Sequence, residues 1–340
     1  MGEETNLSGI RGVRRQVANA LRALRRRILT PGVSATKLGT RGFNEKSPQA
    51  RELLETIGES FLAGYAHVAG SRSAREAEQR LETIPTRFRG FAYEGAGMGS
   101  AVLDALPFTG GRRTGDLLAG RGDDHLYMVY VGVGWAMARL PRFLWPDVSA
   151  YDPLLRWLVL DGYGFHQAYF HTGRYVHARF RDPDFPWTAD RFRWYAGHAI
   201  DQGVGRAMWF VGGTDVELVA TMIDGFPEER RADLYAGAGL AASYAGGAEE
   251  GELLAFWERA GRYRPQIAQG CAFAAEARQR AGLVVPHTLL ATRVFCDMTP
   301  EQAARISEKA RPDGPVQGEV PAYEVWRRRI ADEFASLGRC

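Results

Sequence analysis

The chain has 340 residues, of which 45% are hydrophobic, and a formal net charge of +3. This composition supports a large hydrophobic core, and no run of about 18 uninterrupted apolar residues predicts a membrane span. The N-terminus lacks a signal-peptide core, and three widely spaced cysteines predict neither a disulfide framework nor a zinc site, so we expect a cytoplasmic protein.

Residues 1–30 carry most of the positive charge, with seven arginines against two glutamates. Their apolar residues follow helical spacing: Ile10, Val13, Val17, Leu21, Leu24 and Ile28. This basic amphipathic helix could contact a membrane surface or an acidic partner protein, or it could dock on the rest of the chain. The remaining residues are slightly acidic and contain no recognition motif, so we do not expect nucleic acid as a partner.

A short signature, glycine followed two residues later by glycine or alanine, occurs seven times in mostly apolar sequence. Its first glycines are Gly64, Gly95, Gly132, Gly162, Gly203, Gly237 and Gly270, which lie 31, 37, 30, 41, 34 and 33 residues apart. A period near 34 residues is typical of a two-helix repeat. We predict an all-α fold of about seven degenerate two-helix repeats, an α/α superhelix or solenoid.

Other residues recur in register with the glycines. An arginine precedes the first glycine by six residues in four copies, at Arg89, Arg156, Arg231 and Arg264. Pro85 and Pro227 mark helix starts, and outer helices are expected at 73–83, 215–224 and 251–260. The alanine-rich copies favour helix over strand, and a glycine in mid-helix costs about 1 kcal/mol relative to alanine. Either close helix packing or room for a ligand would explain why it recurs.

Irregular segments interrupt the repeats. We expect an extended lead-in at 31–50, a polar insertion at 107–124 and a break at 172–190, and a linker at 311–322 precedes a last helix at about 323–337. The predicted organisation is therefore an N-terminal helix (1–30), a repeat domain (31–310), and a linker with a C-terminal helix (311–340).

Polar residues directly precede the first glycine in four copies, at Glu94, Asp161, Gln202 and Gln269. Equivalent positions project from one face of successive helices, so we expect Glu94, Asp161 and Gln202 to converge on one partly apolar pocket, with His166 nearby. Glu94, Asp161 and His166 are the candidates for acid–base catalysis. The alternatives are neutralisation of the carboxylates by the repeat arginines, a metal site that also uses Asp201, and a hydrogen-bonded core histidine at 166.

Aromatic residues around the signature could line an apolar channel or simply pack the core. The candidates for substrate binding are Tyr93, Tyr130, Tyr163, Gln202, Arg206 and Trp209. No nucleotide, nucleophile or metal motif identifies a cofactor.

Several segments resemble a known family. They include RRILTP at 26–31, RFRGFAYEGA at 87–96, VGVGWA at 131–136, DPLLRW at 152–157, DGYGFH at 161–166, DQGVGR at 201–206 and RRADL at 230–234. The family is actinobacterial, has no assigned function and is encoded beside enediyne polyketide synthases. The resemblance implies a role in converting a linear polyene to an enediyne core, beside other proteins of the biosynthetic cassette, and implies no catalytic residues.

Two classes of function follow. The first is an enzyme that acts on an apolar polyene inside the array. The second is a non-catalytic scaffold or carrier that binds the polyene or docks partner proteins. A sealed apolar tunnel that ends at the polar residues would favour the enzyme, and an open concave face would favour the scaffold.

Overall fold

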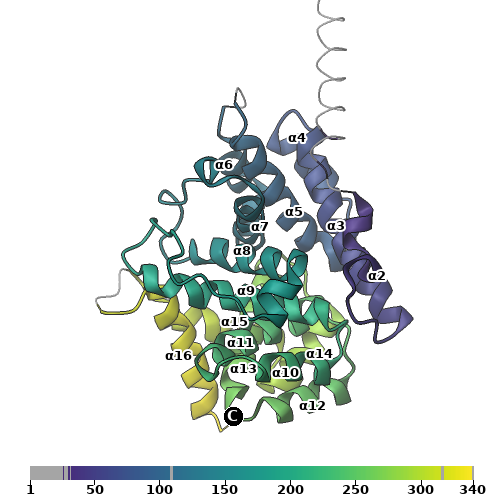
Figure 1. Cartoon of the computed structure of the whole chain (residues 1–340), viewed down its shortest axis with the longest axis vertical. Coiled ribbons are helices and arrows are strands. Elements are labelled where there is room, and N and C mark those ends of the chain that lie inside the picture. Colours follow the sequence, from purple (N-terminus) through teal and green to yellow (C-terminus); the bar gives the residue numbers. More distant parts are fainter. Residues whose placement is uncertain (1–25, 27–29, 31, 108–109, 315–317, 339–340) are drawn as a thin grey trace, which may run out of the picture.

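The computed structural model describes residues 26, 30, 32–107, 110–314 and 318–338. These residues form fifteen α-helices and contain no strand, as predicted (Figure 1). The basic helix expected at 1–30 lies outside the described residues, apart from Arg26 and Thr30.

Seven inner helices each carry one copy of the glycine signature. They are α3 (Pro48–Gly70), α5 (Thr86–Asp104), α7 (Leu126–Arg139), α8 (Trp157–Phe170), α9 (Ala196–Val211), α11 (Glu228–Ala245) and α13 (Arg264–Arg280). Each packs against the next one along the chain, so the inner layer follows chain order (Figure 1). The repeat detected in the sequence is therefore a physical stack of helices.

An outer layer covers parts of this stack. It comprises α4 (Ala74–Leu81), α6 (Arg113–Leu118), α10 (Val216–Asp224), α12 (Glu250–Ala260) and α14 (Pro286–Cys296). The expected outer helices at 73–83, 215–224 and 251–260 correspond to α4, α10 and α12. The expectation that 107–124 is only a polar insertion is wrong, because this segment contains α6, whose Arg113 and Thr114 amides donate to the Asp104 carboxylate.

Two inner helices lack an outer partner. After α7 the chain forms the short 3-10 turn η3 (Arg142–Leu144), and after α8 it forms the π-helical turn η4 (Gly173–His177) and an irregular segment. The array of two-helix repeats is therefore incomplete at its third and fourth units. The irregular segment includes the break expected at 172–190.

The glycines allow neighbouring helix backbones to approach closely. A Cβ atom built on Gly203, the first glycine of α9, would lie 1.8 Å from the carbonyl oxygen of Asp161 on the preceding helix. One built on Gly205, the second, would lie 2.1 Å from the carbonyl oxygen of Leu234 on the following helix. Equivalent contacts recur along the stack, so close packing explains the signature.

Three of the four repeat arginines bind backbone carbonyls through Nε, and the fourth, Arg156, pairs with Asp190 at 2.6 Å instead of with a polar residue that precedes a glycine. Arg89 Nε donates to the Ile84 carbonyl at 3.1 Å, and Arg231 Nε donates to the equivalent Phe226 carbonyl at 2.8 Å. Each bond ties the loop before an inner helix to that helix. The hypothesis that these arginines neutralise Glu94 and Asp161 is therefore wrong.

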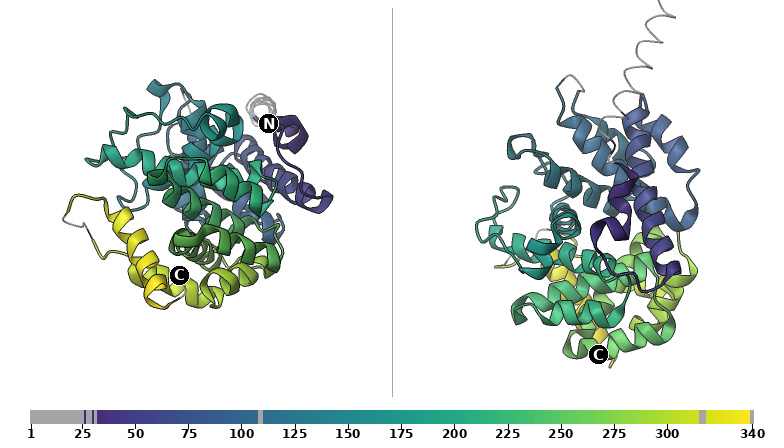
Figure 2. Two further views of the ribbon diagram at one scale, coloured as in Figure 1. Left: turned by 60° about the horizontal axis from the view of Figure 1, so that its bottom comes forward. Right: turned by 45° about the vertical axis from the view of Figure 1, so that its right-hand side comes forward.

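The stack curls back on itself. Arg278 of α13 donates to the Arg87 carbonyl in the first turn of α5 at 3.2 Å, and Tyr127 of α7 donates to the Glu276 carboxylate of α13. After α15 (Pro300–Ala310), α16 (Ala322–Ser336) packs on the later inner helices (Figure 2). Its Arg327 pairs with Asp233 of α11 at 2.8 Å. This curvature encloses the inner faces of the helices instead of leaving an open groove.

Candidate functional site

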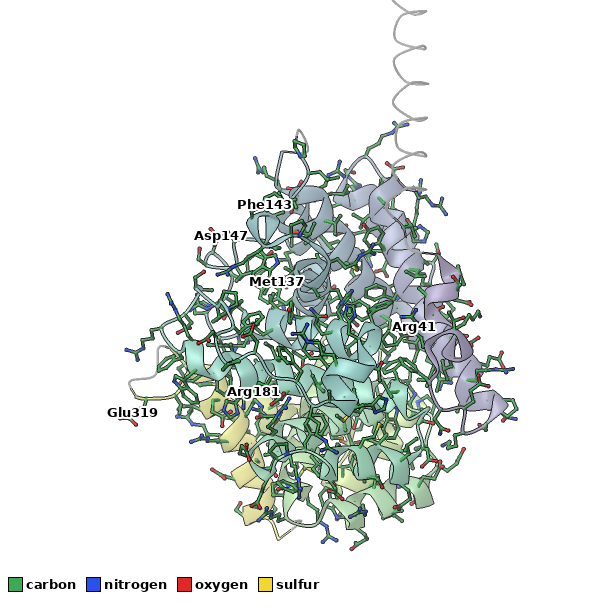
Figure 3. All side chains as sticks on the ribbon, in the orientation of Figure 1. Arg41, Met137, Phe143, Asp147, Arg181 and Glu319 are labelled. Carbon is green, nitrogen blue, oxygen red and sulfur yellow. The ribbon has the colours of Figure 1, made fainter. Side chains whose placement is uncertain are left out.

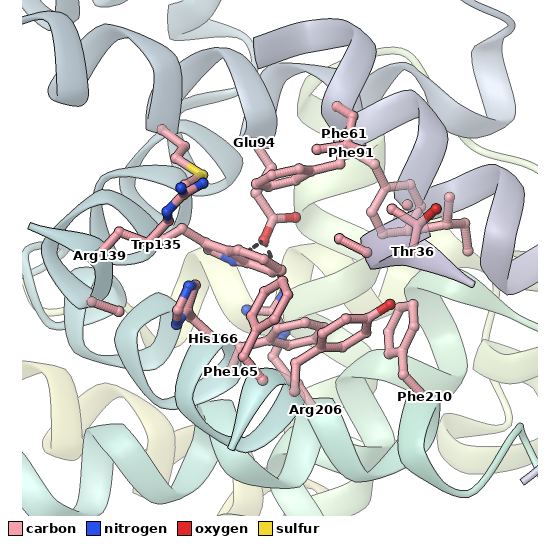
Figure 4. A pocket seen from close by; sticks show the side chains of 18 of the residues that line it. Thr36, Phe61, Phe91, Glu94, Trp135, Arg139, Phe165, His166, Arg206 and Phe210 are labelled. Carbon is pink, nitrogen blue, oxygen red and sulfur yellow. Dashed lines mark hydrogen bonds and ion pairs between the residues drawn. The ribbon is translucent and has the colours of Figure 1, made fainter. Parts of the chain in front are cut away.

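A cavity of about 480 Å³ lies among α3, α5, α7, α8 and α9 (Figure 4). Its wall is mostly apolar and aromatic, and its main apolar side chains are Leu54, Ile57, Phe61, Phe91, Met98, Trp135, Phe165, Tyr169, Phe170 and Phe210. Cavities of this size and composition are typical of small-molecule sites.

The cavity has a buried polar part and an exposed polar part. Glu94 and Arg206 are 2% and 6% exposed, whereas Arg139 and His171 are exposed at the C-terminal ends of α7 and α8. A molecule that enters past Arg139 and His171 would therefore reach Glu94 through an aromatic interior.

The side-chain carboxyl group of Glu94, on α5, accepts one close hydrogen bond. Trp135 Nε1 donates to its Oε1 at 3.0 Å, and Arg206 Nη2 lies 3.8 Å from the same oxygen (Figure 4). Burial raises the pKa of Glu94 to about 7. The charge of Arg206 opposes this rise, and the charge of Asp161 contributes to it. Glu94 can therefore gain or lose a proton near neutral pH.

Arg206 lies beside two carboxyl groups but is much closer to one of them. Its Nη1 forms a direct hydrogen-bonded ion pair with Asp161 Oδ1, much closer than its approach to Glu94. Burial disfavours its charged form, but Asp161 and Glu94 outweigh that effect and raise the pKa of Arg206. One guanidinium thus holds Asp161 closely and Glu94 at a greater distance, and burial raises the pKa of Asp161 as well.

Asp161 lies behind Arg206 as seen from the large cavity. It lines a second cavity of about 50 Å³, together with Tyr244 and Glu276, and Arg206 lines both cavities. Asp161 therefore reaches the large cavity only through Arg206, and we assign it a positioning role.

His166 of α8 also lines the large cavity. Its ring meets the Trp135 ring edge-on at 5.4 Å, and its buried Nδ1 has no hydrogen-bond partner among the described residues. Burial lowers the pKa of His166 to about 3, assisted by the charge of Arg139, so the imidazole is neutral at pH 7. The alternative of a hydrogen-bonded core histidine is therefore wrong, because no described residue pairs with its buried Nδ1.

Five predicted substrate-binding residues lie outside the large cavity. Tyr93 donates to Glu82 at 2.8 Å, and Tyr235, at the equivalent position of its repeat, donates to Asp224 at 3.0 Å. A tyrosine two residues before the first glycine can thus face the outer layer, and Tyr93 does so. Trp209 is also turned away from the cavity, because its Nε1 donates to the Gly246 carbonyl at 2.9 Å.

The other three are also engaged elsewhere. The hydroxyl of Tyr130 accepts from the Asp152 amide at 3.3 Å, and Tyr163 packs against Phe185 with ring centroids 5.1 Å apart. Gln202 accepts a hydrogen bond from Tyr323 of α16 at 3.0 Å. The prediction that Glu94, Asp161 and Gln202 converge on one pocket is therefore wrong for Gln202, and Asp161 reaches the pocket only through Arg206. The stack is curved, so successive helices face different neighbours.

Two groups of cavity residues were not predicted from the sequence: the apolar residues of α3 and the basic residues at the exposed end of the cavity, Arg139 and His171. Leu54, Ile57 and Phe61 recur at helical spacing on α3, which is the signal that could have revealed the first group. Arg139 and His171 gave no such signal, because single charged residues near helix ends are ordinary features of a sequence.

No group of three His, Cys, Asp or Glu side chains in the described part of the chain is arranged to bind a metal ion. None of the described helices is both long and apolar enough to cross a bilayer.

Comparisons with known proteins identify a family but no activity. The family model described as "Protein of unknown function (DUF1702)" matches residues 20–334. No curated protein and no solved structure gives a significant match.

Proposed function

Because the chain belongs to this family of unknown function, we propose a function from its large cavity: it binds an elongated apolar molecule and transfers a proton through Glu94. The observation that carries the proposal is a carboxyl group with a pKa of about 7 at an aromatic cavity. A general acid or base works best when its pKa lies near the operating pH. The proposed activity is therefore acid–base chemistry on an apolar substrate.

The aromatic wall favours a conjugated polyene. Trp135 and Phe165 pack with ring centroids 5.1 Å apart, and Phe165 and Phe210 pack at 5.2 Å. Flat π-systems pack well against such rings. On the resemblance described above, the substrate would be the linear polyene of an enediyne polyketide synthase, and the protein would act beside the other proteins of that cassette.

The proposed reaction is a shift of double bonds. Protonated Glu94 donates its proton to one carbon of the polyene, and the resulting carboxylate removes a proton from another carbon. The π-electrons move between these carbons, so atoms and electrons balance without an oxidant or reductant.

The test compares polyene products formed by the synthase alone and with this protein. Glu94→Gln keeps the side-chain shape and an acceptor for Trp135 Nε1, so we expect folded protein that leaves the polyene unconverted. Glu276→Gln is the matched control, because Glu276 is also buried (6% exposed) and does not line the large cavity. Full conversion by Glu94→Gln would reject proton transfer by Glu94.

A carrier that binds the polyene without altering it is the second candidate. The exposed mouth favours this reading, because a carrier must both load and release its ligand. An open scaffold has less support, since Glu94 and Asp161 are buried instead of displayed on a concave face. Unchanged products together with tight polyene binding would favour the carrier.

A further inference from the structure

Basic side chains surround the mouth of the large cavity. Arg139, in the last turn of α7, and His171, which caps α8, both line the cavity and are exposed. Arg41 of α2 (Leu38–Arg41), labelled in Figure 3, has its guanidinium carbon 5.1 Å from the centre of the ring of Phe170, which precedes His171 and also lines the cavity.

None of these three side chains forms an ion pair or hydrogen bond with another described residue. Two acidic residues of the neighbouring α3 are already engaged, since Glu55 and Glu59 accept from Lys37 at 2.9 and 2.8 Å. Many other exposed arginines of the chain do find carboxylates, as Arg280 does with Asp123 at 2.8 Å. The mouth therefore holds positive charge that the described residues do not neutralise.

A favourable interaction with the helix terminus is the simplest explanation for Arg139, because cations are stabilised at helix C-termini. Arg41 also lies in the last turn of its helix, but this position does not explain its Nε, which is buried without a hydrogen-bond partner among the described residues. Nor does it explain why Arg139 acts on the cavity interior, where its charge lowers the pKa of His166. Both guanidinium groups are placed to act on the cavity and its contents.

We infer that the ligand of this cavity is a long-chain carboxylate, with its apolar chain inside and its carboxylate bound at the mouth by Arg139. Arg41 adds positive potential, and the imidazole of His171 adds a hydrogen-bonding group. An arginine can bind a carboxylate through two parallel hydrogen bonds, which fixes the direction of the head group. This inference rests on the proposed function for its apolar chain but adds a requirement for charge.

This arrangement also decides which part of the chain reacts. With the carboxylate held beside exposed Arg139, Glu94 faces the carbons buried farthest from solvent. Proton transfer would then occur within the conjugated chain and not at the carbon next to the carboxylate.

The probe for this inference is cis-parinaric acid, a conjugated tetraene whose fluorescence rises in apolar sites, compared with its methyl ester. For the wild-type protein we expect the acid to bind about ten-fold more tightly than the ester. This factor is the lower limit expected from one hydrogen bond to a charged group. Arg139→Gln should remove most of this preference and leave ester binding unchanged. Arg142→Gln is the matched control, because Arg142 is exposed three residues further on and does not line the cavity.

The outcomes separate the two proposals. Equal binding of acid and ester by the wild-type protein, or an equal loss of preference in Arg142→Gln, would overturn the carboxylate inference while the apolar site stands. Failure of both probes to bind would overturn the apolar site itself. Raising the salt concentration should weaken binding of the acid and leave binding of the ester unchanged, since salt screens the interactions of exposed charges.

Discussion

The carbonyl oxygen of Asp161 occupies the space that a side chain at Gly203 would need, 1.8 Å from the position of a Cβ atom. This contact between α8 and α9 links the fold to the site. Arg206 lies about one helical turn beyond Gly203, so the same close approach brings its guanidinium onto the Asp161 carboxylate. A glycine selected for packing thereby positions the charge that faces Glu94.

Gly203→Ala should destabilise the protein by about 1–3 kcal/mol or more, because a backbone carbonyl cannot move aside as a flexible side chain can. Gly251→Ala is the control, since nothing lies within 4 Å of an added Cβ at that helical position. There the change should be neutral or stabilising by up to about 1 kcal/mol. Chemical denaturation measures both variants, and equal stabilities would contradict close packing at Gly203.

Asp161→Asn should lower the pKa of Glu94 below its value of about 7. The charge of Asp161 raises that pKa, and its removal would also leave Arg206 with Glu94 as its remaining carboxylate. Infrared titration of the protonated carboxyl band measures the midpoint, and Glu94→Gln identifies the band. An unchanged midpoint would show that Asp161 does not control Glu94.

Glu94 should make the protein less stable as the pH rises. Its pKa is about 7 in the folded state and 4.5 ordinarily, so between these values the folded state binds more protons than the unfolded state. The stabilisation is complete below about pH 4.5 and is lost as the pH rises through 7, a change of up to about 3 kcal/mol. Denaturation curves at pH 5 and pH 8 should therefore show Glu94→Gln gaining stability relative to wild type at the higher pH. A constant difference between the two proteins would argue that Glu94 is not perturbed.

Ala138→Phe should block the cavity without unfolding the protein. Ala138 lines the cavity and is half-buried on α7, so a larger side chain can fill the mouth while the inner stack stays intact. We expect binding of parinaric acid and of its methyl ester to fall at least ten-fold with little change in melting temperature. Ala335→Phe, at an exposed position of α16, should leave both affinities unchanged. Retained affinity in Ala138→Phe would place the apolar ligand elsewhere.

The sequence alone was sufficient to predict the inner helices. A glycine is costly in a helix, so its recurrence near every 34 residues indicated one structural unit, and Pro85 and Pro227 do precede α5 and α11. It also singled out Glu94 and His166, because ionisable groups within apolar helices are unusual. These features follow from local chemistry and spacing, which a sequence displays directly.

Tertiary structure decided the rest. The sequence did not show α6, because a six-residue helix rich in polar residues and glycine has little periodicity, and its start depends on Asp104 from another helix. Nor could it show that Arg206 pairs directly with Asp161 and lies farther from Glu94. These two distances depend on how far the Arg206 side chain extends from α9 toward α8 and α5. The curvature of the stack sets the separation of these helices. The same curvature turned Gln202 toward α16 and enclosed the cavity, because repeat register specifies which positions are equivalent but not which neighbours they meet.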